Sequence, residues 1–291
     1  MIILSPLFEE STPEINPQVC QSDVDKFFNN TKGNIYWSPK LDGVRTWAIV
    51  NRNNSVRYFS RNGKELFNFY PFSDHLIDLA KKTKLKYPVI FDCEVASESK
   101  SVREVMTQLR RLSNIDPSKL ELHIFDIVIS GKPFSERINI LNKAFRGKKY
   151  SNVFQLRYEK SDHTLEQLNN IKIQMISKGY EGIMLHDGSA FYHFGKRSNK
   201  CCKMKEVNTL DLPIVDVVIA PSGHRWEGKL LKIVADYRGQ RIPMSGKLSL
   251  KDREYYAKYP PIGKYAEVDF QEITPRGVLR HPRFIRLRED K

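Results

Sequence analysis

Cysteine and histidine are sparse in this 291-residue sequence, and neither occurs in a pattern typical of metal sites or disulfide-rich folds. No C-x-x-C pair is present, and the seven histidines show no H-E-x-x-H or similar spacing. Both absences argue against a zinc site and a disulfide framework. We therefore expect a reducing compartment and four structural or incidental cysteines, namely Cys20, Cys93, Cys201 and Cys202.

Long apolar runs are also missing. No segment approaches the roughly 18 consecutive apolar residues of a membrane-spanning helix. The first six residues are partly apolar, but they lack the basic region and the hydrophobic stretch of a secretion signal. We expect no membrane partner and a cytoplasmic location.

Two common phosphate-binding loops, G-x-x-x-x-G-K-[ST] and G-x-G-x-x-G, are absent, so a nucleotide would have to be bound in another way. Positive charge, in contrast, is abundant. The 48 Lys and Arg outnumber the 34 Asp and Glu, giving a net charge of +14 and a pI near 9.5. This excess favours a polyanionic partner such as nucleic acid, although a basic protein with an ordinary solvated surface has the same composition.

The first 207 residues alternate strand-like and helix-like segments. Strands rich in β-branched and aromatic residues are expected at 34–37, 45–50, 56–60, 89–95, 120–129 and 182–185. Capping-box spacing predicts helices after Ser101 and after Thr164, the second ending before Gly179. Ser73 and Ser135 are candidate N-caps of two more helices.

The pattern changes near residue 207, so we expect two domains, 1–207 and 208–291. Five short strands are expected at 213–220, 229–237, 240–244, 264–273 and 284–288, with one helix at 250–258 after Ser249. This arrangement suits an OB-fold β-barrel, although another small barrel or sandwich would have the same strand count. The expected fold class is α+β.

The most specific local pattern is K-L-D-G-V-R at residues 40–45, between two strand-like segments. Its position predicts that Lys40 lies on a turn. A lysine in a desolvated site beside other cations can lose its proton and act as a nucleophile. Gly43 would allow a tight turn close to a ligand, and Arg45 would supply a phosphate-binding guanidinium. An exposed β-turn would also explain these six residues.

With this motif the chain resembles the covalent nucleotidyltransferase superfamily, which includes ATP-dependent DNA ligases, RNA ligases and mRNA capping enzymes. The first motif of that superfamily is K-x-D-G-x-R. Its later motifs are matched in order at residues 60–64, 91–94, 123–126, 181–184, 203–205 and 288–291. Ligases usually have glycine where this chain has Cys93. Each later match alone has an ordinary explanation, such as a core position for Phe125, but their order along the chain favours the resemblance.

The resemblance implies a role for individual residues, beginning with Lys40 as the catalytic nucleophile. Contacts to ATP or AMP are implied for Ser38, Arg45, Arg61, Glu94, Phe125, Lys203 and Lys205, with Phe125 stacking on the purine. The DNA 5′-phosphate would be contacted by Arg45, Arg61 and Arg197. Pyrophosphate would be oriented by Arg288 and Lys291. A divalent metal, Mg²⁺ or Mn²⁺, would be held directly or through water by Glu181, Glu94 and Asp42.

Three features favour a DNA ligase within the superfamily: Arg45 two residues after the glycine, the E-G-I-M motif, and the R-x-P-x-F-x-R-x-R-x-D-K ending. The resemblance is to compact viral and bacterial ATP-dependent ligases. It implies a nucleotidyltransferase domain with ATP-grasp-like antiparallel sheets, an OB fold that folds over Lys40, and a monomer acting on nicked duplex DNA. Residues 221–228 and 273–280 could be DNA-contacting loops. The alternatives are an RNA ligase, a capping guanylyltransferase, or a non-catalytic OB-containing nucleic-acid-binding protein.

Overall fold

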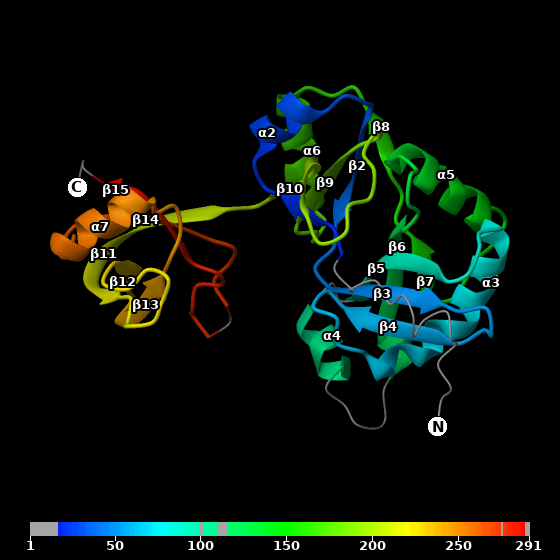
Figure 1. The fold of residues 1–291 in the computed structure, drawn as a ribbon, viewed down its shortest axis with the longest axis horizontal. Coiled ribbons are helices and arrows are strands. Elements are labelled where there is room, and N and C mark those ends of the chain that lie inside the picture. The colour runs from blue at the N-terminus through cyan, green and yellow to red at the C-terminus, as the bar shows by residue number, and fades with distance from the viewer. Residues whose placement is uncertain (1–16, 99–101, 110–115, 275, 289–291) are drawn as a thin grey trace. The chain divides into compact units, whose positions relative to one another are not determined.

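The computed structural model describes residues 17–98, 102–109, 116–274 and 276–288 (Figure 1). The chain divides into two compact units, the first ending at Lys205 and the second beginning at Glu206. In the described part of the chain, no helix combines the length and the apolar character that crossing a membrane requires.

The first unit contains two five-stranded sheets. The sheet that carries Lys40 has the order β1-β10-β9-β2-β8, with strands Val19–Gln21, Arg197–Lys205, Gly182–Asp187, Ile35–Lys40 and Glu159–Ser161. The other has the order β4-β3-β5-β6-β7, with strands Val56–Ser60, Val44–Val50, Val89–Ser97, Leu120–Ile127 and Val153–Gln155. Pairing is antiparallel in both sheets except between β1 and β10 and between β6 and β7.

Helices cover one face of each sheet (Figure 1). The β4–β7 sheet packs against η1 (Phe67–Phe72), α3 (Ser73–Thr83), α4 (Val102–Leu109) and α5 (Phe134–Phe145), and η2 (Pro117–Lys119) precedes β6. Burial of Leu76, Val105 and Leu141 from these helices completes the main core. On the other sheet, α2 (Val24–Asn30) and α6 (Leu165–Ser177) form a smaller core through Phe27 and Leu168.

The caps of α6 follow directly from the sequence. Thr164 and Gln167 form the predicted capping box, in which each side chain bonds the other residue's backbone N–H. At the other end, Gly179 has φ +83° and its N–H bonds the Ile176 carbonyl, while the Tyr180 N–H bonds the Met175 carbonyl. This pair of bonds is the Schellman arrangement that favours glycine after a helix.

Two of the other predicted caps are wrong, and a third lies outside the described residues. Helix α3 begins at Ser73 itself, whose hydroxyl hydrogen-bonds the Tyr58 hydroxyl, and α5 begins after Pro133. The start of α3 is therefore held by a tertiary contact of Ser73, and the start of α5 is set by Pro133. Ser101 is not among the residues that the structure describes.

The second unit has the strand order β13-β12-β11-β14-β15. Its strands are Gln240–Met244, Leu230–Tyr237, Asn208–Ile219, Tyr265–Phe270 and Arg283–Arg288, and α7 (Leu250–Lys258) begins after a capping box of Ser249 and Asp252. These are the five strands and the helix expected for an OB fold. The closed barrel is wrong for the described residues, because regular pairing stops at β13 and β15 and only the single bridge Gly246–Phe284 joins the two edges. The approach is too close for a side chain, since a Cβ on Gly246 would lie 2.0 Å from the Phe284 carbonyl oxygen.

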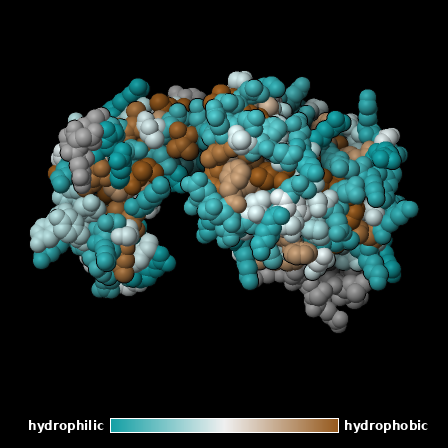
Figure 2. All heavy atoms as spheres, turned by 90° about the horizontal axis from the view of Figure 1, so that it is seen from above, coloured by the Kyte–Doolittle hydropathy of each residue, from teal (hydrophilic) through white to brown (hydrophobic). Residues whose placement is uncertain are grey.

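Hydrophilic residues cover most of the face drawn in Figure 2, with smaller hydrophobic areas between them. Exposed large apolar side chains occur on both units, for example Phe67 and Tyr70 on η1 and Tyr255 on α7. The fold therefore combines apolar cores with a charged outer surface, as the composition predicts.

Candidate active site

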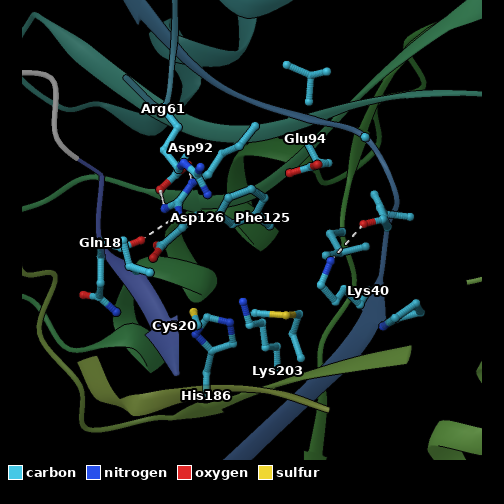
Figure 3. A pocket seen from close by; sticks show the side chains of 18 of the residues that line it. Gln18, Cys20, Lys40, Arg61, Asp92, Glu94, Phe125, Asp126, His186 and Lys203 are labelled. Carbon is cyan, nitrogen blue, oxygen red and sulfur yellow. Dashed lines mark hydrogen bonds and ion pairs between the residues drawn. The ribbon is translucent and has the colours of Figure 1, made fainter. Parts of the chain in front are cut away.

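A cavity of about 510 Å³ lies between the two sheets of the first unit (Figure 3). One sheet contributes residues of β1, β2, β9 and β10 to its lining, and the other contributes residues of β3 to β6. The lining includes several residues predicted from the sequence, namely Lys40, Arg45, Arg61, Glu94, Phe125 and Lys203. The structure therefore brings together motifs that lie up to 163 positions apart, from Lys40 to Lys203.

Lys40 is the last residue of β2, so its predicted position on a turn is wrong. It pairs with Gly182 at the start of β9, and the Glu181 backbone N–H donates to the Lys40 carbonyl at 2.9 Å. The Lys40 ammonium forms an ion pair with the Glu181 carboxylate. Burial lowers the pKa of Lys40 below its ordinary value, and the neighbouring cations Lys203 and Lys205 lower it further, against the attraction of Glu94 and Asp42. A lowered pKa makes the neutral, nucleophilic amine easier to form.

The β2–β3 turn is held against β5 by close backbone contact. A Cβ on Gly43 would lie 2.2 Å from the Val95 carbonyl oxygen. Position 43 therefore does require glycine, as predicted. The group that approaches it closely is the backbone of β5, whereas the prediction was a ligand. This contact keeps the end of β2, and Lys40 with it, beside β5 and Glu94 (Figure 3).

Glu94 lies on β5, where alternate side chains face opposite ways. Asp92 and Glu94 line the cavity, whereas Cys93 between them belongs to the apolar core. A thiol in place of the usual glycine is accommodated because it points into that core. Burial raises the pKa of Glu94 to about 7, although the positive charges of Lys40 and Arg45 act in the opposite direction.

Arg45 is tightly bound inside the cavity. Its Nε and Nη2 donate to the two oxygens of Asp92 at 2.9 and 2.6 Å, and its Nη1 donates to the Gln18 carbonyl at 2.6 Å. Burial lowers the pKa of Arg45, but the charge and hydrogen bonds of Asp92 outweigh it and raise that pKa above its usual range. The guanidinium lies 5.3 Å from the centre of the Phe125 ring. A phosphate near Phe125 would thus meet a cation with a fixed orientation.

Aromatic and neutral side chains also line the cavity near Phe125. Tyr158 and His186 line it, and the Tyr158 hydroxyl donates to the Phe125 carbonyl at 3.1 Å. His186 stacks on the Phe134 ring, with centroids 4.3 Å apart and planes 10° from parallel. Burial lowers the pKa of His186 to about 3, so its imidazole is neutral. This side of the cavity suits a flat, uncharged ring such as a nucleobase.

Several lining residues were not identified from the sequence: Gln18, Asp92, Tyr158, Met184, His186 and Tyr192. Strand alternation could have indicated three of them. Asp92 lies two residues before Glu94, and Met184 and His186 lie two and four residues after Gly182 on β9. Gln18 and Tyr192 lie outside every motif and could be found only from the fold.

Other predicted site residues lie outside the cavity lining. Ser38 is fully buried on β2, Asp42 is half-buried in the β2–β3 turn, Glu181 contacts Lys40 directly, and Lys205 pairs with Gly182 at the end of β10. Arg197 is exposed at the start of β10. In the second unit, Arg288 donates to both oxygens of Asp211 at 3.1 and 2.9 Å, and Lys291 is outside the described residues.

Cys20 and Cys201 form a disulfide, which is not what the expected reducing compartment predicts. The two residues are 181 positions apart and lie on the paired strands β1 and β10, with their Cα atoms 4.8 Å apart. No local sequence pattern indicates such a pairing. Cys93 and Cys202 are buried free thiols, and Cys20 lines the cavity.

The carboxylates near Lys40 are hard oxygen ligands of the kind that Mg²⁺ and Mn²⁺ prefer. Among the described residues, no group of three or more His, Cys, Asp or Glu could hold a metal by itself. The usual Mg²⁺ site in nucleotide enzymes needs only one or two protein carboxylates, which act together with substrate phosphates and water. Glu94, Glu181 and Asp42 therefore fit a metal that arrives with a nucleotide.

Two family models match this chain. Residues 17–205 match the ATP dependent DNA ligase domain, and residues 223–288 match the DNA ligase OB-like domain. The first match lies in the first structural unit and covers more than half of the sequence, and the second match lies in the second unit.

Proteins similar to this chain carry the same family name. A DNA ligase 2 of Methanosarcina acetivorans is 25% identical over 92% of this chain and 54% of its own length. A DNA ligase of Archaeoglobus fulgidus is 28% identical over 87% of this chain and 51% of its own length. The chain thus spans about half the length of the curated relatives that it matches.

Solved structures share the fold at low sequence identity. The structure named Pmar-Lig_Pre has a TM-score of 0.78 and 23% identity, covering 98% of this chain and 71% of its own. A structure of a Lig E DNA ligase has a TM-score of 0.68 and 20% identity, covering 94% of this chain and 99% of its own. These likenesses establish the arrangement of strands and helices described above.

Proposed function

Because the chain belongs to the ATP-dependent DNA ligase family, we propose that it seals nicks in duplex DNA through an AMP bound covalently to Lys40. The observation that carries this proposal is the setting of Lys40. Its buried amine has a lowered pKa and lines a cavity together with the cations Arg45 and Lys203, the acid Glu94 and the aromatic ring of Phe125.

The first step would form a lysyl-AMP. The neutral Nζ of Lys40 attacks the α-phosphorus of ATP, a phosphorus–nitrogen bond forms, and the bond to pyrophosphate breaks. Lys203 and Arg45 would balance charge on the α-phosphate, and Phe125 would stack on adenine. We propose that Lys205 and Ser38 support the nucleotide from the same strands, and that Arg288 and Lys291 orient the pyrophosphate.

The next two steps would transfer AMP and seal the strand. An oxygen of the DNA 5′-phosphate attacks the AMP phosphorus and releases Lys40, with Arg45, Arg61 and Arg197 as proposed contacts of that phosphate. The 3′-hydroxyl then attacks the 5′-phosphorus, forming the phosphodiester and releasing AMP. A bound Mg²⁺ or Mn²⁺ would neutralise charge developing on the phosphates, held by Glu94, Glu181 and Asp42 directly or through water.

Labelling with ATP tests the proposal directly. The protein is incubated with α-labelled ATP and Mg²⁺ and separated on a denaturing gel. We expect label on the wild type and on Lys143→Ala, which removes an exposed lysine of α5, and none on Lys40→Ala. A wild type that takes no label would reject the enzyme and favour a non-catalytic nucleic-acid-binding protein.

Substrate choice is tested in parallel with nicked DNA, nicked RNA and labelled GTP. We expect sealing of nicked DNA and no label from GTP. A preference for nicked RNA would indicate an RNA ligase, and label from GTP would indicate a capping enzyme. We further propose that the protein acts as a monomer in the cytoplasm, which size-exclusion chromatography and localisation of a tagged protein would test.

A further inference from the structure

The Arg45 guanidinium belongs to a ring of contacts made by hydrogen bonds and the covalent chain, and part of this ring comes from a segment that belongs to none of the sequence motifs. Arg45 donates to Asp92 and to the Gln18 carbonyl, as described above. Asp92 Oδ2 also accepts from the Tyr192 hydroxyl at 2.5 Å. The next residue closes the ring, because the His193 backbone N–H donates to Gln18 Oε1 at 2.8 Å.

The groups in this ring are held in place by their surroundings. Asp92 is fully buried, Gln18 is 6% exposed and Tyr192 is 7% exposed. The Tyr192 ring packs against Trp47 and Phe194, with centroids 6.2 and 5.4 Å away. Burial raises the pKa of Tyr192 well above its usual value, so the hydroxyl stays protonated and acts as a donor.

The segment that carries Tyr192 is itself anchored. It connects β9 with β10, and the Ala190 carbonyl accepts from the Phe134 N–H and from Arg137 Nη1 at 2.8 and 3.0 Å. Arg137 is buried and forms two hydrogen bonds with Asp126. The Tyr192 hydroxyl therefore has a fixed position relative to the cavity, independent of Arg45.

We propose that Tyr192 is a positioning residue that acts through Asp92 to fix the orientation of the Arg45 guanidinium for the substrate phosphate. Asp92 lies beside Arg61 and Gln18 in the cavity, away from Lys40 (Figure 3). Without the Tyr192 hydroxyl, Asp92 Oδ2 loses a buried donor, and the carboxylate can rotate away from the geometry that accepts from both Nε and Nη2 of Arg45. The inference rests on the proposed ligase function, since it assigns Arg45 a phosphate to bind.

A double-mutant cycle of Tyr192→Phe and Arg45→Lys separates positioning from general stability. Tyr192→Phe keeps the aromatic side chain and its packing. Arg45→Lys keeps the charge but replaces the planar guanidinium, so the two-point contact with Asp92 is lost. Single-turnover sealing of nicked DNA should fall about tenfold in Tyr192→Phe, the size expected for one hydrogen bond to a charged group. In the Arg45→Lys background the same change should have almost no further effect.

Tyr237→Phe is the matched control, because Tyr237 is a buried tyrosine of the second unit whose hydroxyl has no hydrogen-bond partner within the described residues. It should seal at the wild-type rate. Equal losses from Tyr192→Phe in the two Arg45 backgrounds would overturn the positioning role, because they would show that the hydroxyl does not act through Arg45.

Thermal unfolding of the wild type, the two single variants and the double variant tests the coupling of Tyr192 and Arg45 without an activity assay. The Tm shifts of the two single variants should not add in the double variant, because both remove parts of one ring. Additive shifts would overturn the ring itself. A wild type that takes no label from ATP would overturn the proposed function, while the unfolding cycle would still decide whether Tyr192 and Arg45 are coupled.

Discussion

Burial shifts the pKa values of both Lys40 and Glu94 away from their ordinary values. Burial lowers the pKa of the amine and raises the pKa of the carboxyl to about 7, because it disfavours the charged form of each. The proposed chemistry needs the neutral amine and the ionised carboxylate. Both required forms are therefore favoured by raising the pH, and the site should be least active on the acidic side of neutrality.

We expect lysine labelling at subsaturating ATP to rise with pH and to bend near pH 7. Each of the two groups that is in its inactive form lowers the rate about tenfold per pH unit, so the fall should be steeper below pH 7 than above it. Glu94→Gln should be slower throughout but should lack the bend near pH 7, since it has no carboxyl to ionise. Parallel profiles for the two proteins would assign the titration to another group.

Glu94 should also affect stability, with a definite sign. Its folded pKa of about 7 exceeds the ordinary value of 4.5, so between these values the folded protein holds more protons than the unfolded chain. Stability from this group is present at low pH and is lost as the pH rises from 4.5 to about 7. Unfolding in urea should therefore show Glu94→Gln gaining stability relative to the wild type across this range. A constant difference between the two proteins would contradict the raised pKa.

At the scale of single residues, motif matching identified residues that the fold brings together, but not the partners that orient them. Lys40, Glu94 and Phe125 line one cavity as the resemblance implies. The Asp92–Tyr192 contact joins residues 100 positions apart, and neither position has an unusual local pattern. Such pairs are set by how two sheets face each other, which a local pattern does not encode.

At the scale of elements, strand existence was predictable and strand ends were less so. The expected strands at 56–60 and 240–244 coincide with β4 and β13. Turn-forming residues directly before or after these segments mark where the strands end. Strand β2 instead continues through Pro39 to Lys40, because these residues pair with β9. Tertiary pairing thus extended a strand past the point where its local propensity ended.

The disulfide between β1 and β10 gives a prediction at this scale. Removing a disulfide that closes a long loop typically lowers stability by about 2–4 kcal/mol. Cys20→Ser should therefore lower the Tm by about 5–10 °C, and a reductant should have a similar effect on the wild type. The reductant should not affect Cys20→Ser.

Thiol titration of the unfolded, unreduced protein provides an independent check. The two free thiols are Cys93 and Cys202, so two reactive thiols are expected in the wild type. Four reactive thiols, together with a Tm that is unchanged by the reductant, would show that the protein does not form this disulfide. That result would restore the reducing location expected from the sequence.

At the scale of the whole molecule, the net charge of +14 should make the proposed DNA binding strongly dependent on salt. If about five phosphates are contacted, the affinity should fall about 500-fold between about 50 and 200 mM salt, because each contact releases counterions. Fluorescence anisotropy with a labelled nicked duplex measures this slope. A flat salt dependence would show that the basic residues do not meet the DNA backbone.

Arg288 belongs to the second unit, whereas Lys40 belongs to the first, and the proposed role of Arg288 is limited to the pyrophosphate of ATP. This division of roles predicts that the reaction steps respond differently to one substitution. Arg288→Ala should slow lysine labelling by at least about tenfold, the loss typical of one charged contact in the transition state. Sealing of a nick that already carries AMP should change by less than about threefold, because that step has no pyrophosphate.

The contact of Arg288 with Asp211 supplies the control for this prediction. Asp211→Asn weakens the same ion pair inside the second unit but keeps the Arg288 cation. If the loss in Arg288→Ala came from a weakened second unit, Asp211→Asn would reproduce it. Near-normal labelling in Asp211→Asn would instead assign the effect to the cation. Equal losses of labelling and sealing in Arg288→Ala would reject a role confined to pyrophosphate, because sealing would then need the same side chain.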